Sequence, residues 1–254
     1  MEIYAFANQK GGVGKTTVTL GLAVALASQN LSALLIDLDP QASATKVLGV
    51  EAEQRHSIAD VMLEPDRFSL SDVLVGTDWG FDLAPAEMAL ASRESRRATA
   101  DEFILSRQLA DVVGYDVALV DCPPSLGLLT LNALTAASRL VVVTEASFLA
   151  LQGIDELLET HELVRAHYNG ELEFAGVIVN RVERTVEHRE SVVEIERYFG
   201  AELVWRPLLP KRTVVQDATR RGVPVGELSR RPARELAFAF TTLARRIEAS
   251  RVGV

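Results

Sequence analysis

The chain has 254 residues, is 48% hydrophobic and carries a formal net charge of −9. This length suffices for one α/β domain with a large core, and we treat residues 1–254 as a single domain. The single cysteine, Cys122, excludes a disulfide framework and a Cys-x-x-Cys metal site within one chain, and is typical of a reducing cytoplasm. No apolar run approaches the ~18 residues that a membrane span needs. Because the chain opens directly into an apolar run, we expect neither a signal peptide nor an N-terminal helix-turn-helix extension.

Apolar runs typical of buried strands alternate with helical patterns along the chain. This alternation predicts an α/β fold with one doubly wound, mostly parallel sheet and helices on both faces. The predicted strands are 2–8, 33–38, 116–121, 139–144 and 174–180, with 81–84 as a short further strand. The predicted helices are 15–29, 98–113, 148–168, 186–199 and 233–249, and we expect short helices and loops in 41–80.

A glycine-rich loop joins the first strand to the first helix, which is the context that a phosphate-binding P-loop requires. Glycines let the backbone turn its N–H groups toward an anion, and the helix N-terminus adds its positive dipole end. We expect Lys15 to reach the β- and γ-phosphates of a nucleotide and the Thr16 hydroxyl to bind Mg²⁺. The nucleotide-binding loop is Lys10, Gly11, Gly12, Val13, Gly14, Lys15, Thr16 and Thr17.

Two features of this loop depart from the general P-loop pattern. Gln9 occupies the place of the usual first glycine, and a second lysine, Lys10, precedes the glycines. A cation there would repel Lys15 unless phosphates lay between the two. We therefore expect Lys10 to reach into the nucleotide site of a second subunit, in a dimer that meets face to face over the nucleotide.

Polar side chains end several of the predicted strands. Asp37 and Asp39 follow the second strand, Asp121 ends the third, and Asn180 ends the last. Ligands of open α/β sheets bind at the carboxyl ends of strands, so one pocket can gather these residues. Asp121 is the expected Mg²⁺ partner, through a coordinated water. The alternatives are a strand-end cap for Asp121 and an Asp-Pro turn for Asp39.

The segment 8–17 resembles the deviant Walker A box of the ParA/MinD family of P-loop ATPases, and small, Soj-like ParA members in particular. Further stretches agree with that family in order: 34–41, 118–125, 176–181, and the set 209–211, 216–218 and 222–224. The resemblance covers nearly the whole chain and implies ATP and Mg²⁺ as cofactors. It implies that Asp39 orients the attacking water, with Asp37 nearer the metal and Lys15, and that the partner subunit supplies Lys10.

The same resemblance assigns further parts of the chain. Asn180 would contact adenine, and Pro210 would pack on the other side of the base. The segment 127–134 resembles the family's switch II and dimer-facing helix. The stretch 143–147 departs from the family, because many members carry a proline there.

The basic residues are concentrated in the last third of the chain. Residues 1–180 have a charge balance of −14, whereas residues 181–254 have a balance of +5. A basic face on an acidic protein favours phosphate contacts with DNA, and no module for sequence-specific readout is visible. The main candidates for non-specific binding of double-stranded DNA are Lys211, Arg212, Arg220 and Arg221, followed by Arg189, and the weaker ones are Arg184, Arg230 and Arg231.

The resemblance implies a partition ATPase whose ATP-bound homodimer binds nucleoid DNA and whose weak hydrolysis a ParB-like partner stimulates. The cargo stays open among chromosome, plasmid, chemoreceptor cluster and microcompartment. The alternative is a MinD-like membrane ATPase, but the apolar residues of 236–247 form one core-facing stripe and little chain follows. The single cysteine disfavours a metal-cluster ATPase, and the lack of tyrosine after Tyr198 disfavours a bacterial tyrosine kinase. We expect a cytoplasmic, nucleoid-associated protein with no membrane partner.

Overall fold

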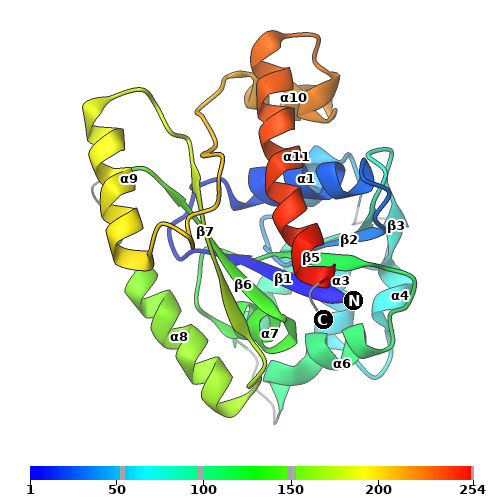
Figure 1. Ribbon diagram of the computed structural model, residues 1–254. Helices are drawn as coiled ribbons and strands as arrows, with labels where there is room; N and C mark the ends of the chain where they lie inside the picture. Colours follow the sequence, from blue (N-terminus) through cyan, green and yellow to red (C-terminus); the bar gives the residue numbers. More distant parts are fainter. Residues whose placement is uncertain (52–54, 96–99, 148–150, 152, 253–254) are drawn as a thin grey trace.

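The computed structural model describes residues 1–51, 55–95, 100–147, 151 and 153–252. Its centre is one seven-stranded sheet in the order β3-β4-β2-β5-β1-β6-β7 (Figure 1). All neighbouring strands run parallel except β3 and β4, which are antiparallel. The predicted doubly wound sheet is confirmed. The strands are β1 (Glu2–Ala7), β2 (Ala33–Asp37), β3 (Val75–Gly76), β4 (Asp82–Ala84), β5 (Val117–Asp121), β6 (Arg139–Glu145) and β7 (Glu173–Asn180).

Alternate residues of the central strands enter two separate hydrophobic cores. In β1, Tyr4 and Phe6 pack with helices α1 (Lys15–Ala27) and α11 (Arg231–Val252). Ala5 and Ala7 point to the other face, where α3, α4, α6, α7, α8 and α9 supply the second core. This follows from the two-residue period of a strand, which sends successive side chains to opposite faces. The bounds of these helices are α3 (Ile58–Leu63), α4 (Leu70–Val73), α6 (Ile104–Ala110), α7 (Leu128–Ala136), α8 (Ile154–His167) and α9 (Val186–Phe199).

The two helices of the first face, α1 and α11, are in direct contact. A Cβ added at Gly21 of α1 would lie 2.5 Å from the ring of Phe240 in α11. Glycine at this position therefore lets α11 lie directly against α1, as Figure 1 shows. Within the described residues, no helix is long and apolar enough to cross a bilayer.

Two predicted helices differ from the observed ones. In place of 98–113, a 3₁₀ turn at Asp101–Phe103 leads into α6, and it follows Ala100 in a left-handed conformation. In place of 148–168, α8 begins after Gly153, whose φ of 80° is incompatible with a continuing helix. Positions 98–99, 148–150 and 152 lie outside the described residues. The sequence reading also missed α10 (Val214–Arg221) and strand β3, while α2 (Ser43–Val47) and α5 (Ser92–Ser95) are short.

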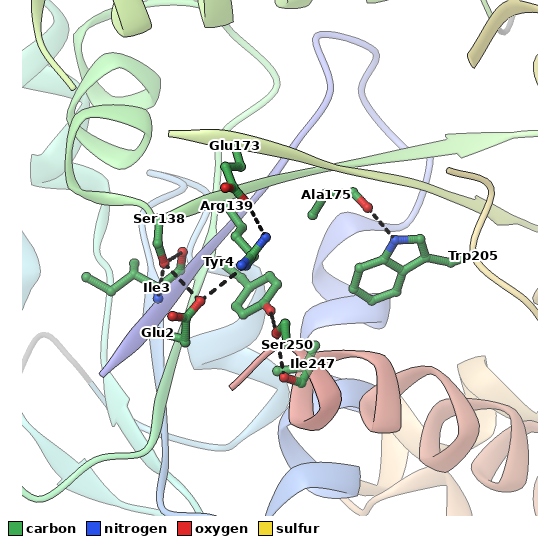
Figure 2. A network of polar contacts seen from close by, with 10 residues as sticks. All are labelled: Glu2, Ile3, Tyr4, Ser138, Arg139, Glu173, Ala175, Trp205, Ile247 and Ser250. Carbon is green, nitrogen blue, oxygen red and sulfur yellow. Dashed lines mark hydrogen bonds and ion pairs between the residues drawn. The ribbon is translucent and has the colours of Figure 1, made fainter. Parts of the chain in front are cut away.

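A polar network lies at the amino ends of β1, β6 and β7 and involves no predicted site residue (Figure 2). Arg139 of β6 bridges Glu2, at 3.2 Å, and Glu173. The Tyr4 and Ser250 hydroxyls share a hydrogen bond of 2.5 Å, which ties the last turn of α11 to β1. Burial raises the pKa of Tyr4, so this phenol stays neutral. The contacts at the amino ends of these strands stabilise the fold. The carboxyl ends of the strands, where the predicted site residues lie, are on the opposite side of the sheet.

Candidate functional site

The loop between β1 and α1 has the conformation that an anion-binding backbone needs. Gly12 and Gly14 have φ values of 80° and 94°, in the left-handed region that favours glycine. Gly14 is also the N-cap of α1, and a Cβ there would lie 2.3 Å from Nδ2 of Asn180. The free N–H groups of the first turn of α1 therefore open onto the loop, where a phosphate would meet the positive end of the helix dipole.

Lys15 is almost fully buried under this loop, with 7% of its surface exposed. Its Nζ donates to the Asn8 carbonyl oxygen at 3.0 Å, and burial lowers its pKa although nearby charges, chiefly Asp121, raise it. Asn8 also donates to the Val143 carbonyl at 2.8 Å and accepts from the Lys10 N–H at 2.9 Å. Asn8 thus organises the loop. This role of Asn8 was not predicted from the sequence, where its signal is its position between the strand and the glycines.

Asp37 and Asp121 lie side by side, because β2 and β5 pair in register at their last residues. Oδ2 of Asp37 accepts hydrogen bonds from the Thr45 N–H at 2.9 Å and the Thr45 hydroxyl at 2.8 Å. Burial raises the pKa of Asp37 to about 6. Asp39 is less buried, and its Oδ1 accepts from the Gln41 N–H at 2.9 Å, so the Asp-Pro turn is present. Thr45 is a second residue that the sequence reading missed.

Asp121 has the most unusual environment of the three carboxylates. It is 1% exposed, and neither oxygen accepts a hydrogen bond of normal geometry from any described residue. Burial, followed by the charge of Asp37, raises its pKa well above the usual value, while nearby Thr16 and Lys15 lower it. A buried carboxylate with two unpartnered oxygens is costly unless a cation neutralises it.

The donor set around Asp121 fits a magnesium ion. Mg²⁺ binds through one or two protein ligands together with waters and substrate phosphates. Among the described residues, no group of three or more His, Cys, Asp or Glu side chains is arranged to hold a metal alone. The Thr16 hydroxyl and the Asp121 carboxylate, next to the phosphate-binding loop, are therefore the residues that would hold it.

In the single chain, Lys10 contacts an acid of its own subunit. Its Nζ lies 2.6 Å from Oε1 of Glu145, the last residue of β6, and the two side chains are 40% and 26% exposed. Glu145 belongs to the stretch 143–147 that departs from the family pattern. Ion pairs this exposed contribute little, so the lysine can exchange its partner at small cost.

Asn180 and Pro210 come to the same edge of the sheet. Nδ2 of Asn180 donates to the Val13 carbonyl at 2.9 Å, which ties the end of β7 to the glycine loop. Pro210 pairs with Val182, just beyond β7. It lines a surface hollow of about 430 Å³ together with Val182, Glu183, Arg184, Leu208, Lys211 and Arg212. Asn180 therefore supports the loop, besides its expected contact with the base.

The basic candidates divide into paired and unpaired side chains. Lys211 pairs with Glu183 at 2.9 Å, and Arg212 pairs with Glu235 at 3.3 Å. Arg230 and Arg231 also have acidic partners. Over the described part of the chain, no ion pair involves the exposed side chains of Arg184, Arg189, Arg220 or Arg221. These four keep an uncompensated charge for an external anion, and Arg220 and Arg221 end α10 together.

Comparison with known proteins adds independent findings. Residues 1–174 match the model of a family described as an AAA domain. The sporulation initiation inhibitor protein Soj of Bacillus subtilis is 36% identical over 229 residues, which cover 88% of this chain and 90% of that protein. The chromosome-partitioning ATPase Soj of Thermus thermophilus is 37% identical over 257 residues, covering 96% and 94%.

A solved structure is similar over the full length of the chain. It is the crystal structure of cobyrinic acid a,c-diamide synthase from Mycobacterium smegmatis with a bound ATP analogue and magnesium. The TM-score is 0.85 at 32% identity, and the superposition covers 100% of this chain and 96% of that chain. The fold therefore recurs in a protein that holds an ATP analogue and magnesium.

Proposed function

Because this chain belongs to the ParA/MinD-like family of P-loop ATPases, we propose that it is a ParA-type partition ATPase. It uses ATP and Mg²⁺. The observation that carries the proposal is the buried Asp121 carboxylate, whose two unpartnered oxygens lie beside Thr16 and Lys15 at the glycine loop. That arrangement suits a metal–nucleotide complex, and the similarity to the chromosome-partitioning ATPase Soj of Thermus thermophilus connects the chain with chromosome partitioning.

The residues of the chain have distinct tasks in hydrolysis. The loop amides and Lys15 bind the phosphates, with Lys15 exchanging its bond to Asn8 for phosphate oxygens. Bound magnesium supplies charge neutralisation, held by Thr16 and Asp121. Asp39 orients the attacking water, since its Oδ2 accepts no hydrogen bond from the described residues and is free to do so.

Dimerisation completes the site. Two subunits meet over ATP, and Lys10 leaves Glu145 to reach the phosphates of the partner subunit, where its charge stabilises the transition state. The dimer brings two copies of the basic face together and binds nucleoid DNA without sequence preference. Weak hydrolysis, stimulated by a ParB-like partner on the cargo, ends the dimer and releases the protein from DNA.

The test is binding to a non-specific DNA duplex with ATP, ADP or no nucleotide, at two salt concentrations. We expect binding only with ATP and weaker binding at the higher salt. Reversal of two unpaired charges, in an Arg220→Glu/Arg221→Glu variant, should abolish binding. The matched control is an Arg67→Glu/Arg107→Glu variant, which makes the same charge change elsewhere and should still bind DNA in the presence of ATP.

Failure to bind DNA in any state, with normal ATP-dependent dimerisation, would refute this function. The MinD-like alternative would then be tested by co-sedimentation with liposomes in the presence of ATP. We expect no such co-sedimentation.

Amide synthesis is a second candidate, because the similar structure is that of a diamide synthase. Such an enzyme takes its nitrogen from ammonia or from glutamine, and release from glutamine commonly requires a reactive cysteine. Cys122 is 1% exposed, and burial raises its pKa, so it is not available as a nucleophile. ATP-dependent amidation of cobyrinic acid, assayed with ammonia, would distinguish this candidate from the partition function.

A further inference from the structure

The helix that follows the Asp121 strand is capped by a residue from a distant segment. Oε2 of Glu94 accepts a hydrogen bond from the Leu128 N–H at 2.8 Å, and Oε1 accepts from the Leu129 N–H at 3.4 Å. These are free N–H groups at the N-terminus of α7. The N-cap itself is Gly127, which has no side chain to offer, so the carboxylate of α5 takes that task.

Gly127 and Glu94 fit each other closely. A Cβ added at Gly127 would lie 2.1 Å from Oε2 and 2.7 Å from the carboxyl carbon of Glu94. The φ of this glycine is −81°, so its backbone conformation is open to any residue. Glycine is needed here because of the space that the carboxylate occupies.

The capped end of α7 is also the end of the loop that leaves Asp121. That loop is fixed at its start, where the Cys122 N–H donates to the Phe6 carbonyl at 3.2 Å. The Thr130 hydroxyl of α7 donates to the Ser125 carbonyl at 2.6 Å, so the loop moves with the first turn of α7. The position of the first turn therefore decides where the loop lies relative to the phosphates.

The residue next to Glu94 takes part in a buried set of contacts with the segment before α6. Arg93 forms a buried ion pair of 2.5 Å with Asp101, and both side chains are less than 10% exposed. Asn132, in the middle of α7, donates to the Asp101 carbonyl at 2.8 Å and accepts from the Leu105 N–H at 3.1 Å. Helix α7 is therefore contacted at two places, by Glu94 at its first turn and by Asp101 and Leu105 at Asn132.

We propose that Glu94 is a positioning residue for ATP hydrolysis, acting through the α7 cap on the loop between Asp121 and Gly127. This inference rests on the ATPase activity of the proposed function and not on DNA binding. A carboxylate at a helix N-terminus gains from the dipole as well as from hydrogen bonds. Its loss shifts the loop, whereas the glycine loop that binds the phosphates is untouched.

The test compares Glu94→Gln with Asp72→Asn in steady-state hydrolysis and in binding of a fluorescent ATP analogue with Mg²⁺. Asp72 is the matched control, because its carboxylate accepts from the Ser69 N–H at 2.9 Å and caps α4 away from the site. We expect Glu94→Gln to lower kcat about tenfold, less than the roughly hundredfold that a misplacement of about 1 Å can cost. KM and nucleotide affinity should stay at the wild-type value, and Asp72→Asn should keep the wild-type kcat.

A second variant keeps the test decisive if Glu94→Gln folds poorly. Gly127→Ala places a methyl group against the carboxylate and should also lower kcat without changing nucleotide affinity. In the double variant the two effects should not add, since both act on one contact. A wild-type kcat in the variants, or an equal fall in Asp72→Asn, would overturn the role of Glu94. If the wild type did not bind DNA but Glu94→Gln still lowered kcat, the proposed partition function would be overturned and the role of Glu94 in hydrolysis would stand.

Discussion

Removal of the acid that holds Lys10 within its own subunit should strengthen the ATP-bound dimer. In Glu145→Gln the lysine no longer has to leave a charged partner 2.6 Å away before it reaches across the interface. Exposed ion pairs contribute about 0.2–1 kcal/mol each. Because the side chains are 40% and 26% exposed, we take about 0.5 kcal/mol per subunit and about 1 kcal/mol per dimer. That free energy corresponds to a dissociation constant about fivefold lower.

The assay is sedimentation equilibrium with ATP, in an Asp39→Ala background that prevents hydrolysis during the run. The matched control is Glu156→Gln, which removes a neighbouring charge that contacts Gln9 at 2.8 Å and not Lys10. We expect the control to leave the dissociation constant unchanged and Lys10→Ala to abolish the dimer. A dimer that is equally strong or weaker in Glu145→Gln would refute the reasoning, because the contact with Glu145 would then not compete with the interface.

The remaining predictions concern catalysis, pH and packing. Asp39→Ala should lower the hydrolysis rate by about 10²–10⁴ and hold the protein on DNA, and wild-type turnover in this variant would disprove the role of Asp39. Burial raises the pKa of Asp37 from 3.8 to about 6, so its contribution to stability is complete below pH 3.8 and is lost as the pH rises to 6. The nucleotide-free wild type should therefore lose on the order of 3 kcal/mol relative to Asp37→Asn over that range in urea unfolding, and parallel pH profiles of the two proteins would contradict this. Gly21→Ala puts a Cβ 2.5 Å from the Phe240 ring and should destabilise the fold by about 1–3 kcal/mol, measured as a lower Tm. An unchanged Tm would contradict the packing argument.

The glycine loop and the strand-end carboxylates could be predicted because their signals are local. A loop of glycines between an apolar run and Gly-Lys-Thr determines its own backbone conformation, and the places of Asp37, Asp121 and Asn180 follow from where each strand ends. The parallel sheet then brings these ends to one edge, as the register of Asp37 with Asp121 shows. The predictions of one continuous helix over 98–113 and another over 148–168 were wrong. Ala100 and Gly153 have left-handed backbone conformations and interrupt an otherwise helical sequence pattern.

The sequence by itself determined the fold class, the phosphate-binding loop and the acids of the site, because each depends on periodicity or on residues close together in the chain. The tertiary structure decided which distant groups support them. Three contacts illustrate this. Thr45 contacts Asp37, Glu145 contacts Lys10, and Glu94 contacts the first turn of α7, across sequence separations of 8, 135 and 34 residues, respectively. Partners of this kind depend on the order of strands in the sheet and on how helices pack over it, and neither is encoded in a local pattern.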